Sequence, residues 1–105
     1  MTRGEVWWAE LPAPAGRRPV LLLSRSEAYA IRSLVTVAPV TTRIRGIPAE
    51  VPLGLSDGLP KAGVANLDAI VTVAKSVLRE RIASLGQEKR RAVDEAIHFA
   101  LGLRH

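Results

Sequence analysis

The sequence has 105 residues, 48% hydrophobic and 24% charged, which suits one folded domain with one core and excludes a wholly disordered chain. Fifteen Lys and Arg against ten Asp and Glu give a net charge of +5, which predicts an acidic partner. Cysteine is absent and His98 and His105 are the two histidines, which excludes disulfides, thiolate metal sites and a His-rich metal cluster.

Arginine dominates the cations, because only Lys61, Lys75 and Lys89 are lysines. A guanidinium suits phosphate and carboxylate recognition, although a GC-rich genome would produce the same bias. The first residues contain no signal region, and no apolar run reaches the roughly 20 residues that span a membrane. We therefore expect a cytoplasmic protein that has no membrane contact.

Strand patterns and their interruptions fill the first half of the chain. Alternating or continuous apolar residues predict strands over 5–11, 19–24 and 34–40, the second of them buried on both faces. Two prolines and a glycine break the chain between 11 and 16, and 24–33 predicts a helical turn or a loop. Trp7 and Trp8 point to opposite sides of the first strand, and we expect Trp8 in the core and Trp7 facing outward.

The second half begins with a basic corner at 41–46, followed by an edge strand at 49–53 and an exposed loop at 54–63. Two short strands at 63–67 and 69–73 are interrupted at Asp68, and 79–85 fits a strand or a helix. Helical periodicity over 87–103 places an apolar stripe on one face, and Ser84 with Gln87 has capping-box spacing. That stripe consists of Val93, Ile97, Ala100 and Leu101.

Five to seven short strands in so small a chain are best closed as a curled, barrel-like sheet, which limits exposed edges. We expect one mainly β domain over 1–105, with the C-terminal amphipathic helix either plugging the barrel or lying outside it.

Four sequence blocks at the corners of these elements carry more specific information. They are GEVWWAEL at 4–11, GRRPVLLLS at 16–24, VAPVTTR at 37–43 and GVANLDAIVT at 63–72. In this order and spacing they strongly resemble the MazF/PemK family of toxins, and the resemblance extends through the C-terminal helix. It implies an SH3-like barrel with a C-terminal helix, a homodimer, and a basic groove for RNA across the dimer.

The same resemblance implies the activity of a ribosome-independent endoribonuclease of a toxin–antitoxin pair. The family cleaves single-stranded RNA without a metal or another cofactor, through attack of the 2′-hydroxyl on the adjacent phosphate, leaving a cyclic phosphate and a 5′-hydroxyl. The family's active pair falls on Arg18 and Thr41. A fixed guanidinium can stabilise charge on phosphate oxygens, and Pro19 restricts Arg18 to extended backbone. Thr41, a poor base, would hydrogen-bond the phosphate or orient the 2′-hydroxyl.

Further site residues follow from the same matching. Asp68 corresponds to an acidic residue that contributes to catalysis or RNA contact in some members, and its alternative role is to cap a turn or pair with an arginine. The remaining candidates for contact with RNA are Arg17, Thr42, Arg43, Arg45 and Trp7. An outward Trp7 would stack a base or lie in the dimer interface.

The loop at 12–17 departs from the family pattern, because it is short and lacks the acidic residue and the Gly-Ser pair that many members carry. Family-based expectations about gating and base preference therefore do not transfer. Arg17 stands where some members have a histidine, so a histidine-assisted mechanism does not transfer either. The expected partners are single-stranded RNA (mRNA, with rRNA and tRNA as alternatives) and an antitoxin whose acidic segment lies in the groove.

Two alternatives remain open. A CcdB-like toxin of the same fold would act on a protein target through its C-terminal helix, and a non-catalytic barrel would bind RNA or DNA without cleaving it. Arg18 and Thr41 in matching blocks argue against the CcdB-like toxin, because a toxin that acts on a protein target does not need an active pair.

Overall fold

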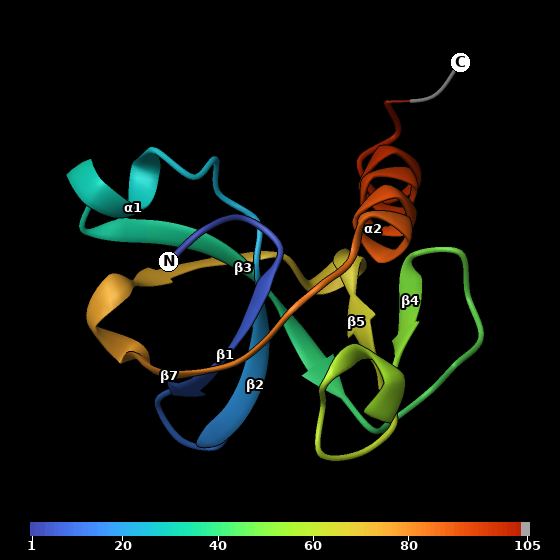
Figure 1. The fold of residues 1–105 in the computed structure, drawn as a ribbon, viewed down its shortest axis with the longest axis horizontal. Helices are drawn as coiled ribbons and strands as arrows, with labels where there is room; N and C mark the ends of the chain where they lie inside the picture. Colours follow the sequence, from blue (N-terminus) through green and yellow to red (C-terminus); the bar gives the residue numbers. More distant parts are fainter. Residues whose placement is uncertain (104–105) are drawn as a thin grey trace.

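The computed structural model describes residues 1–103 and shows a curled antiparallel sheet with one long helix at its C-terminal end (Figure 1). The strands are β1 (Glu5–Glu10), β2 (Arg17–Leu22), β3 (Leu34–Thr41), β4 (Glu50–Leu53), β5 (Gly63–Asn66), β6 (Val71–Ala74) and β7 (Leu78–Ser84). The helices are α1 (Ala28–Ile31) and α2 (Gln87–Ala100), with short 3-10 turns η1 (Leu55–Asp57), η2 (Leu67–Ala69) and η3 (Lys75–Val77). The predicted mainly β, barrel-like fold with a C-terminal helix is confirmed; the predicted domain's last two residues, 104–105, lie outside the described part.

Strand β3 is the centre of the sheet. Along one edge it pairs with β2, and along the other it pairs first with β6 and then, at residues 40 and 41, with β5. The path β4-β5-β3-β2-β1-β7 makes β4 an edge strand, as predicted. Because β3 passes from one partner to the next, its C-terminal end lies where the two halves of the sheet meet (Figure 1).

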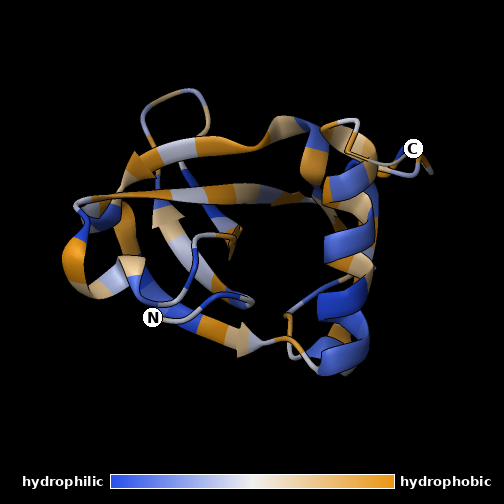
Figure 2. Ribbon diagram, turned by 90° about the horizontal axis from the view of Figure 1, so that it is seen from above, coloured by the Kyte–Doolittle hydropathy of each residue, from blue (hydrophilic) through white to orange (hydrophobic). Residues whose placement is uncertain are grey.

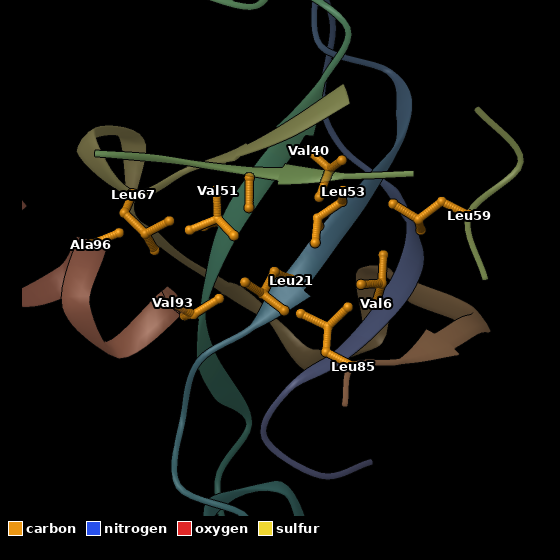
Figure 3. Packing of buried hydrophobic residues seen from close by; sticks show 12 residues of the cluster. Val6, Leu21, Val40, Val51, Leu53, Leu59, Leu67, Leu85, Val93 and Ala96 are labelled. Carbon is orange, nitrogen blue, oxygen red and sulfur yellow. The ribbon is translucent and has the colours of Figure 1, made fainter. Parts of the chain in front are cut away.

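Two hydrophobic clusters lie on opposite sides of the sheet. Figure 3 shows the larger one, in which Leu21 lies among Val6, Val51, Leu53 and side chains from α2. The smaller cluster is built from side chains of β1, β2, β3, α1 and β7: Ala9, Val20, Leu22, Tyr29, Val35, Val37 and Leu78. The apolar run of β2 is buried, as its sequence predicts, and removing such side chains from water is the main stabilising contribution.

Helix α2 packs outside the sheet against β4 and η2 through Val93 and Ala96, with its hydrophilic side outward (Figure 2). The expected stripe is wrong at Leu101, which follows the helix and is 59% exposed. The predicted capping box is also absent: Gly86 is the N-cap, and Ser84 Oγ instead accepts a hydrogen bond from Arg90. None of the helices within residues 1–103 is long and apolar enough to cross a membrane.

Some boundaries differ from the sequence prediction in ways that matter for the site. Strand β2 begins two residues earlier, at Arg17, and β3 runs to Thr41, because antiparallel pairing continues past the apolar runs. The ambiguous segment at 79–85 is strand β7, which pairs with β1. The loop at 54–63 is not wholly exposed, because Leu59 is only 4% exposed and packs in the larger cluster.

Candidate functional site

Arg18 and Thr41 lie on neighbouring strands. Val20 of β2 is opposite Pro39 of β3, and Arg18 and Thr41 each lie two residues further along, at the same end of this pair of strands. The two residues also line the same two surface cavities. The structure therefore brings together the pair that the sequence matching selected from positions 23 residues apart.

The two cavities differ in character. The larger, of about 330 Å³, is lined by Trp8, Arg17, Arg18, Pro19, Val40, Thr41, Thr42, Leu59, Pro60, Lys61, Ala62 and Gly63. The smaller, of about 210 Å³, is lined by Arg18, Pro39, Thr41, Arg43, Arg45, Glu50, Asn66 and Ala69. Apolar rings and a leucine contribute to the larger cavity, whereas most side chains of the smaller can form hydrogen bonds. Arg18 and Thr41 stand where the two cavities adjoin.

Arg18 is half-buried, and its guanidinium is uncommitted. Within residues 1–103 no hydrogen bond or ion pair occupies this side chain, and its Nε is buried without a partner. Buried polar groups in folded proteins are almost always paired, so an orphaned donor calls for an explanation such as a ligand. The Arg18 guanidinium is therefore placed to receive an anion through charge-assisted hydrogen bonds.

Thr41 closes the corner that follows β3. Its Oγ1 accepts a hydrogen bond from the Arg43 amide at 3.1 Å, which leaves the hydroxyl proton available to a ligand. Strand β5 passes very close to this corner: a Cβ added at Gly63 would come within 2.6 Å of the Thr41 carbonyl oxygen. Only glycine fits there, so backbone packing fixes the position of Thr41.

A buried carboxylate, Glu50, organises the basic corner. This residue is 9% exposed, and its Oε1 accepts hydrogen bonds from the amides of Arg45 (3.0 Å) and Gly46 (2.9 Å). Glu50 thereby holds the backbone that carries Arg43 and Arg45, whose side chains line the smaller cavity without an ion pair in the described chain. Sequence reasoning missed Glu50; the available signal was a lone acidic residue in an edge strand directly after a basic run.

The rim of the larger cavity carries a stacked aromatic–cation pair. The Arg17 guanidinium lies over the Trp8 indole, with Cζ 4.7 Å from the ring centroid, and forms an ion pair with Glu10 at 3.2 Å. Thr42 lines the same cavity. Arg17 and Thr42 are thus placed beside Arg18 and Thr41, as the sequence predicts.

The expected roles of the two tryptophans are reversed. Trp7 packs against the smaller hydrophobic cluster and lines neither cavity of the site, whereas the half-buried Trp8 lines the larger cavity. The Trp7 indole N–H donates to Glu5 Oε1 at 2.9 Å. Burial opposes ionisation of the Glu5 carboxyl, but hydrogen bonds from Trp7 and Thr2 outweigh it and lower the Glu5 pKa below its usual value. Alternation along a strand predicts that the two rings diverge, but not which ring faces which side.

Asp68 is not among the residues that line the two cavities. It lies in the 3-10 turn η2, is exposed, and its backbone amide donates to Asn66 Oδ1 at 3.0 Å. Its neighbours Asn66 and Ala69 line the smaller cavity instead. The turn is capped by Asn66, which sequence reasoning did not select. Among residues 1–103, no group of three or more His, Cys, Asp or Glu side chains is arranged to hold a metal ion.

Comparison with known proteins gives one consistent family. A family model described as "PemK-like, MazF-like toxin of type II toxin-antitoxin system" matches residues 2–101. The chain is 43% identical over 100 residues to the "Probable endoribonuclease MazF5" of Mycobacterium tuberculosis, covering 94% of this chain and 91% of the relative. It is 37% identical over 86 residues to "Endoribonuclease MazF3" of the same species, covering 82% of this chain and 84% of that protein.

Solved structures agree with these matches. The "Mycobacterium tuberculosis toxin MazF-mt6" superposes with a TM-score of 0.88 at 34% identity, covering 96% of this chain and 99% of that chain. A second structure, "Endoribonuclease in complex with its cognate antitoxin from Mycobacterial species", gives a TM-score of 0.89 at 28% identity over 100% of this chain and 98% of that chain.

Proposed function

The chain belongs to the MazF/PemK family of endoribonuclease toxins of type II toxin–antitoxin systems, and from this premise we propose that it cleaves single-stranded RNA at selected sequences, without the ribosome and without a metal ion. The observation that carries the proposal is the Arg18–Thr41 pair, where an uncommitted guanidinium and a hydroxyl face the same two cavities.

The proposed reaction is a transphosphorylation within the RNA chain. The 2′-oxygen attacks the adjacent phosphorus while the bond from phosphorus to the 5′-oxygen breaks. The 2′-hydroxyl gives up its proton, the departing 5′-oxygen takes one up, and the products are a cyclic phosphate and a 5′-hydroxyl. Negative charge grows on the non-bridging oxygens, and two N–H groups of Arg18 are suited to bind it as it forms.

Thr41 has a positioning role in this proposal. Packing of β5 and the turn to Arg43 fix the residue, so its hydroxyl can hold the phosphate or the 2′-hydroxyl in line for attack. A threonine hydroxyl is too weakly acidic and too weakly basic to move protons unaided at neutral pH. Loss of Thr41 should therefore cost less activity than loss of Arg18.

Cations around the pair extend the anion-binding surface. Arg17 and Lys61 line the larger cavity, and Arg43 and Arg45 line the smaller, so a strand of RNA crossing the Arg18–Thr41 pair meets positive charge on both sides. Asp68 is exposed beside this surface, and in this proposal it contributes to RNA contact without lining either cavity. Such a surface would serve mRNA, rRNA or tRNA alike.

The same surface would receive an antitoxin. One solved relative is described as being in complex with its cognate antitoxin, and a carboxylate-rich segment presents charge like that of an RNA backbone. We propose that such a segment occupies the cavities and blocks RNA, and that the toxin acts in the cytoplasm as a homodimer. Light scattering of the purified chain, alone and with the antitoxin, measures both assemblies.

The decisive experiment incubates the protein with single-stranded RNA in EDTA and maps the ends. Cyclic phosphates and 5′-hydroxyls at a recurring sequence are expected from the wild type, with cleavage strongly reduced by Arg18→Ala and retained by Arg91→Ala, which alters an exposed arginine of α2. Intact RNA would contradict the proposal. Salt-sensitive binding without cleavage would favour the non-catalytic barrel, and toxicity that depends on the C-terminal helix but not on Arg18 would favour a protein target.

A further inference from the structure

We propose that the larger cavity is a nucleobase subsite in which the Trp8 indole is the stacking surface. In the free protein the Arg17 guanidinium covers this ring face, and the bound base displaces it. The inference rests on the proposed RNA substrate and adds to it the residue that binds the base next to the cleaved phosphate. Trp8 was expected in the core, so the assignment comes from the cavity rather than from the sequence.

The lining of this cavity matches a planar heterocycle followed by a phosphate. Trp8, Pro19, Leu59 and Pro60 provide apolar surface, while Arg17 and Lys61 add positive charge. Its volume of about 330 Å³ lies at the lower end of the range of about 300–1,000 Å³ for small-ligand sites. A nucleotide fits this lining, because its flat base can pack against the apolar side chains and its phosphate can pair with the cations.

The indole face already binds a planar group. The Arg17 guanidinium lies 4.7 Å from the Trp8 centroid, which shows that this face is reachable from the cavity. Within residues 1–103, Arg17 is held there by the Trp8 ring and by Glu10, whose side chain is 44% exposed, and by no other side chain. Exposed ion pairs contribute little stability, so a nucleobase can take the ring face while Arg17 turns to a phosphate.

The position of the subsite links it to the chemistry. Arg18 and Thr41 line the same cavity as Trp8, so a base stacked on Trp8 belongs to a nucleotide that adjoins the cleaved phosphate. Stacking tolerates every base, because each has a π-face. Trp8 therefore supplies affinity and alignment, and we assign the choice of sequence to the smaller cavity, where the side chains of Asn66, Arg43 and Arg45 present hydrogen-bonding groups.

The two tryptophans make this inference directly measurable, since they are the only two in the chain. Trp7→Phe leaves Trp8 as the sole indole reporter, and Trp8→Phe leaves Trp7 as the matched control. Each variant is titrated with single-stranded oligo(dT), which lacks the attacking 2′-hydroxyl and can be used whether or not RNA is cleaved. Fluorescence of the Trp7→Phe protein should change on binding, and that of the Trp8→Phe protein should not. An oligonucleotide of the same length with abasic sites in place of the bases should not produce the change.

A kinetic arm separates stacking from a merely structural role. Trp8→Leu should raise KM for RNA by about five- to a hundredfold while kcat falls less than KM rises, and Trp8→Phe, which keeps an aromatic ring, should restore most of the loss. Circular dichroism confirms that each variant is folded; if Trp8→Leu does not fold, the fluorescence arm still decides.

Failure of the inference and failure of the proposed function give different results. If RNA is cleaved but Trp8 emission does not respond to nucleic acid, or if Trp7 responds instead, the subsite is overturned and the nuclease stands. If Trp8 responds and the abasic control does not, yet no RNA is cleaved, the subsite is supported and the nuclease proposal fails.

Discussion

The cations beside α2 and the cations around the two cavities are used in opposite ways. Arg90 donates to the Leu85 carbonyl at 2.7 Å and to Ser84 Oγ at 3.0 Å, and Arg3 pairs with Asp94 at 3.0 Å. Around the cavities, Arg18, Arg43 and Arg45 have side chains without a hydrogen bond or ion pair in the described chain. The first group joins the N-terminal segment and α2 to the sheet, whereas the second is held by backbone and left open to a ligand.

This contrast teaches that net charge is a poor guide to where a protein binds anions. A cation that satisfies a carbonyl or a carboxylate contributes to the fold and has little left for a ligand. Glu50 shows how the cavity side avoids that outcome: its carboxylate accepts backbone amides of the basic corner and leaves the guanidinium groups free. Variants of the two groups should therefore separate activity from stability.

The largest expected effect is the loss of RNA cleavage caused by Arg18→Ala. Removing the donors that bind growing phosphate charge should lower kcat by about 10²–10³-fold. The free energy of unfolding should change little, because Arg18 makes no hydrogen bond or ion pair within residues 1–103. Single-turnover cleavage and urea denaturation of the same preparation check both parts. Arg18→Lys should recover only part of the rate, because an ammonium lacks the two-donor fork; full recovery would show that charge alone suffices.

Substitutions of Thr41 test whether its hydroxyl, like the Arg18 guanidinium, acts on bound RNA rather than on the fold. Thr41→Val keeps the shape but removes the hydroxyl and its bond with the Arg43 amide, so kcat should fall by about 10–100-fold. Thr41→Ser keeps the hydroxyl and should stay within a few-fold of the wild type. A Thr41→Val protein as active as the wild type, beside an impaired Thr41→Ser protein, would mean that shape at this position matters and the hydroxyl does not.

The sequence predicted more of the fold than of the site's surroundings. Apolar runs and prolines identify most strands, because burial and backbone restriction act locally. Leu59 was missed because a turn residue becomes buried only through packing with distant strands. The Arg18–Thr41 pair came from family resemblance. The contributions of Trp8, Glu50 and Asn66 depend on strand register and loop closure, which no single segment encodes.

Arg90→Ala tests the cations beside α2, which we expect to stabilise the fold and not to bind RNA. The measurement is the free energy of unfolding. Loss of its hydrogen bonds to Leu85 and Ser84 should lower the free energy of unfolding by about 1–3 kcal/mol, measured as a shift of the urea midpoint. Cleavage per folded molecule should be unchanged. A variant as stable as the wild type but impaired in cleavage would reverse the assignment of these cations.

The smallest expected effect extends the contrast to two acidic residues of β1 that each pair with an arginine. Glu5 lies 3.6 Å from Arg81, and Glu10 lies 3.2 Å from Arg17, but their side chains are 10% and 44% exposed. Burial opposes ionisation of Glu5, and the stronger effect of its hydrogen bonds with Trp7 and Thr2 lowers its pKa below 4.5 in the folded protein. A carboxyl with a lowered folded-state pKa stabilises the protein above its unfolded-state value, and the contribution disappears as pH falls through the folded-state pKa.

Glu5→Gln should therefore lower the free energy of unfolding at neutral pH and flatten its decline below pH 4.5 relative to the wild type. Glu10→Gln is the matched control, and at neutral pH its free energy of unfolding should stay close to that of the wild type, since an exposed pair at the cavity rim contributes little. Urea denaturation at pH 7 compares the three proteins, and measurements at lower pH compare Glu5→Gln with the wild type. If Glu10→Gln destabilised the protein at pH 7 and Glu5→Gln did not, the carboxylate that stabilises the fold would lie at the cavity, and the division between structural and ligand-binding charge would fail on β1.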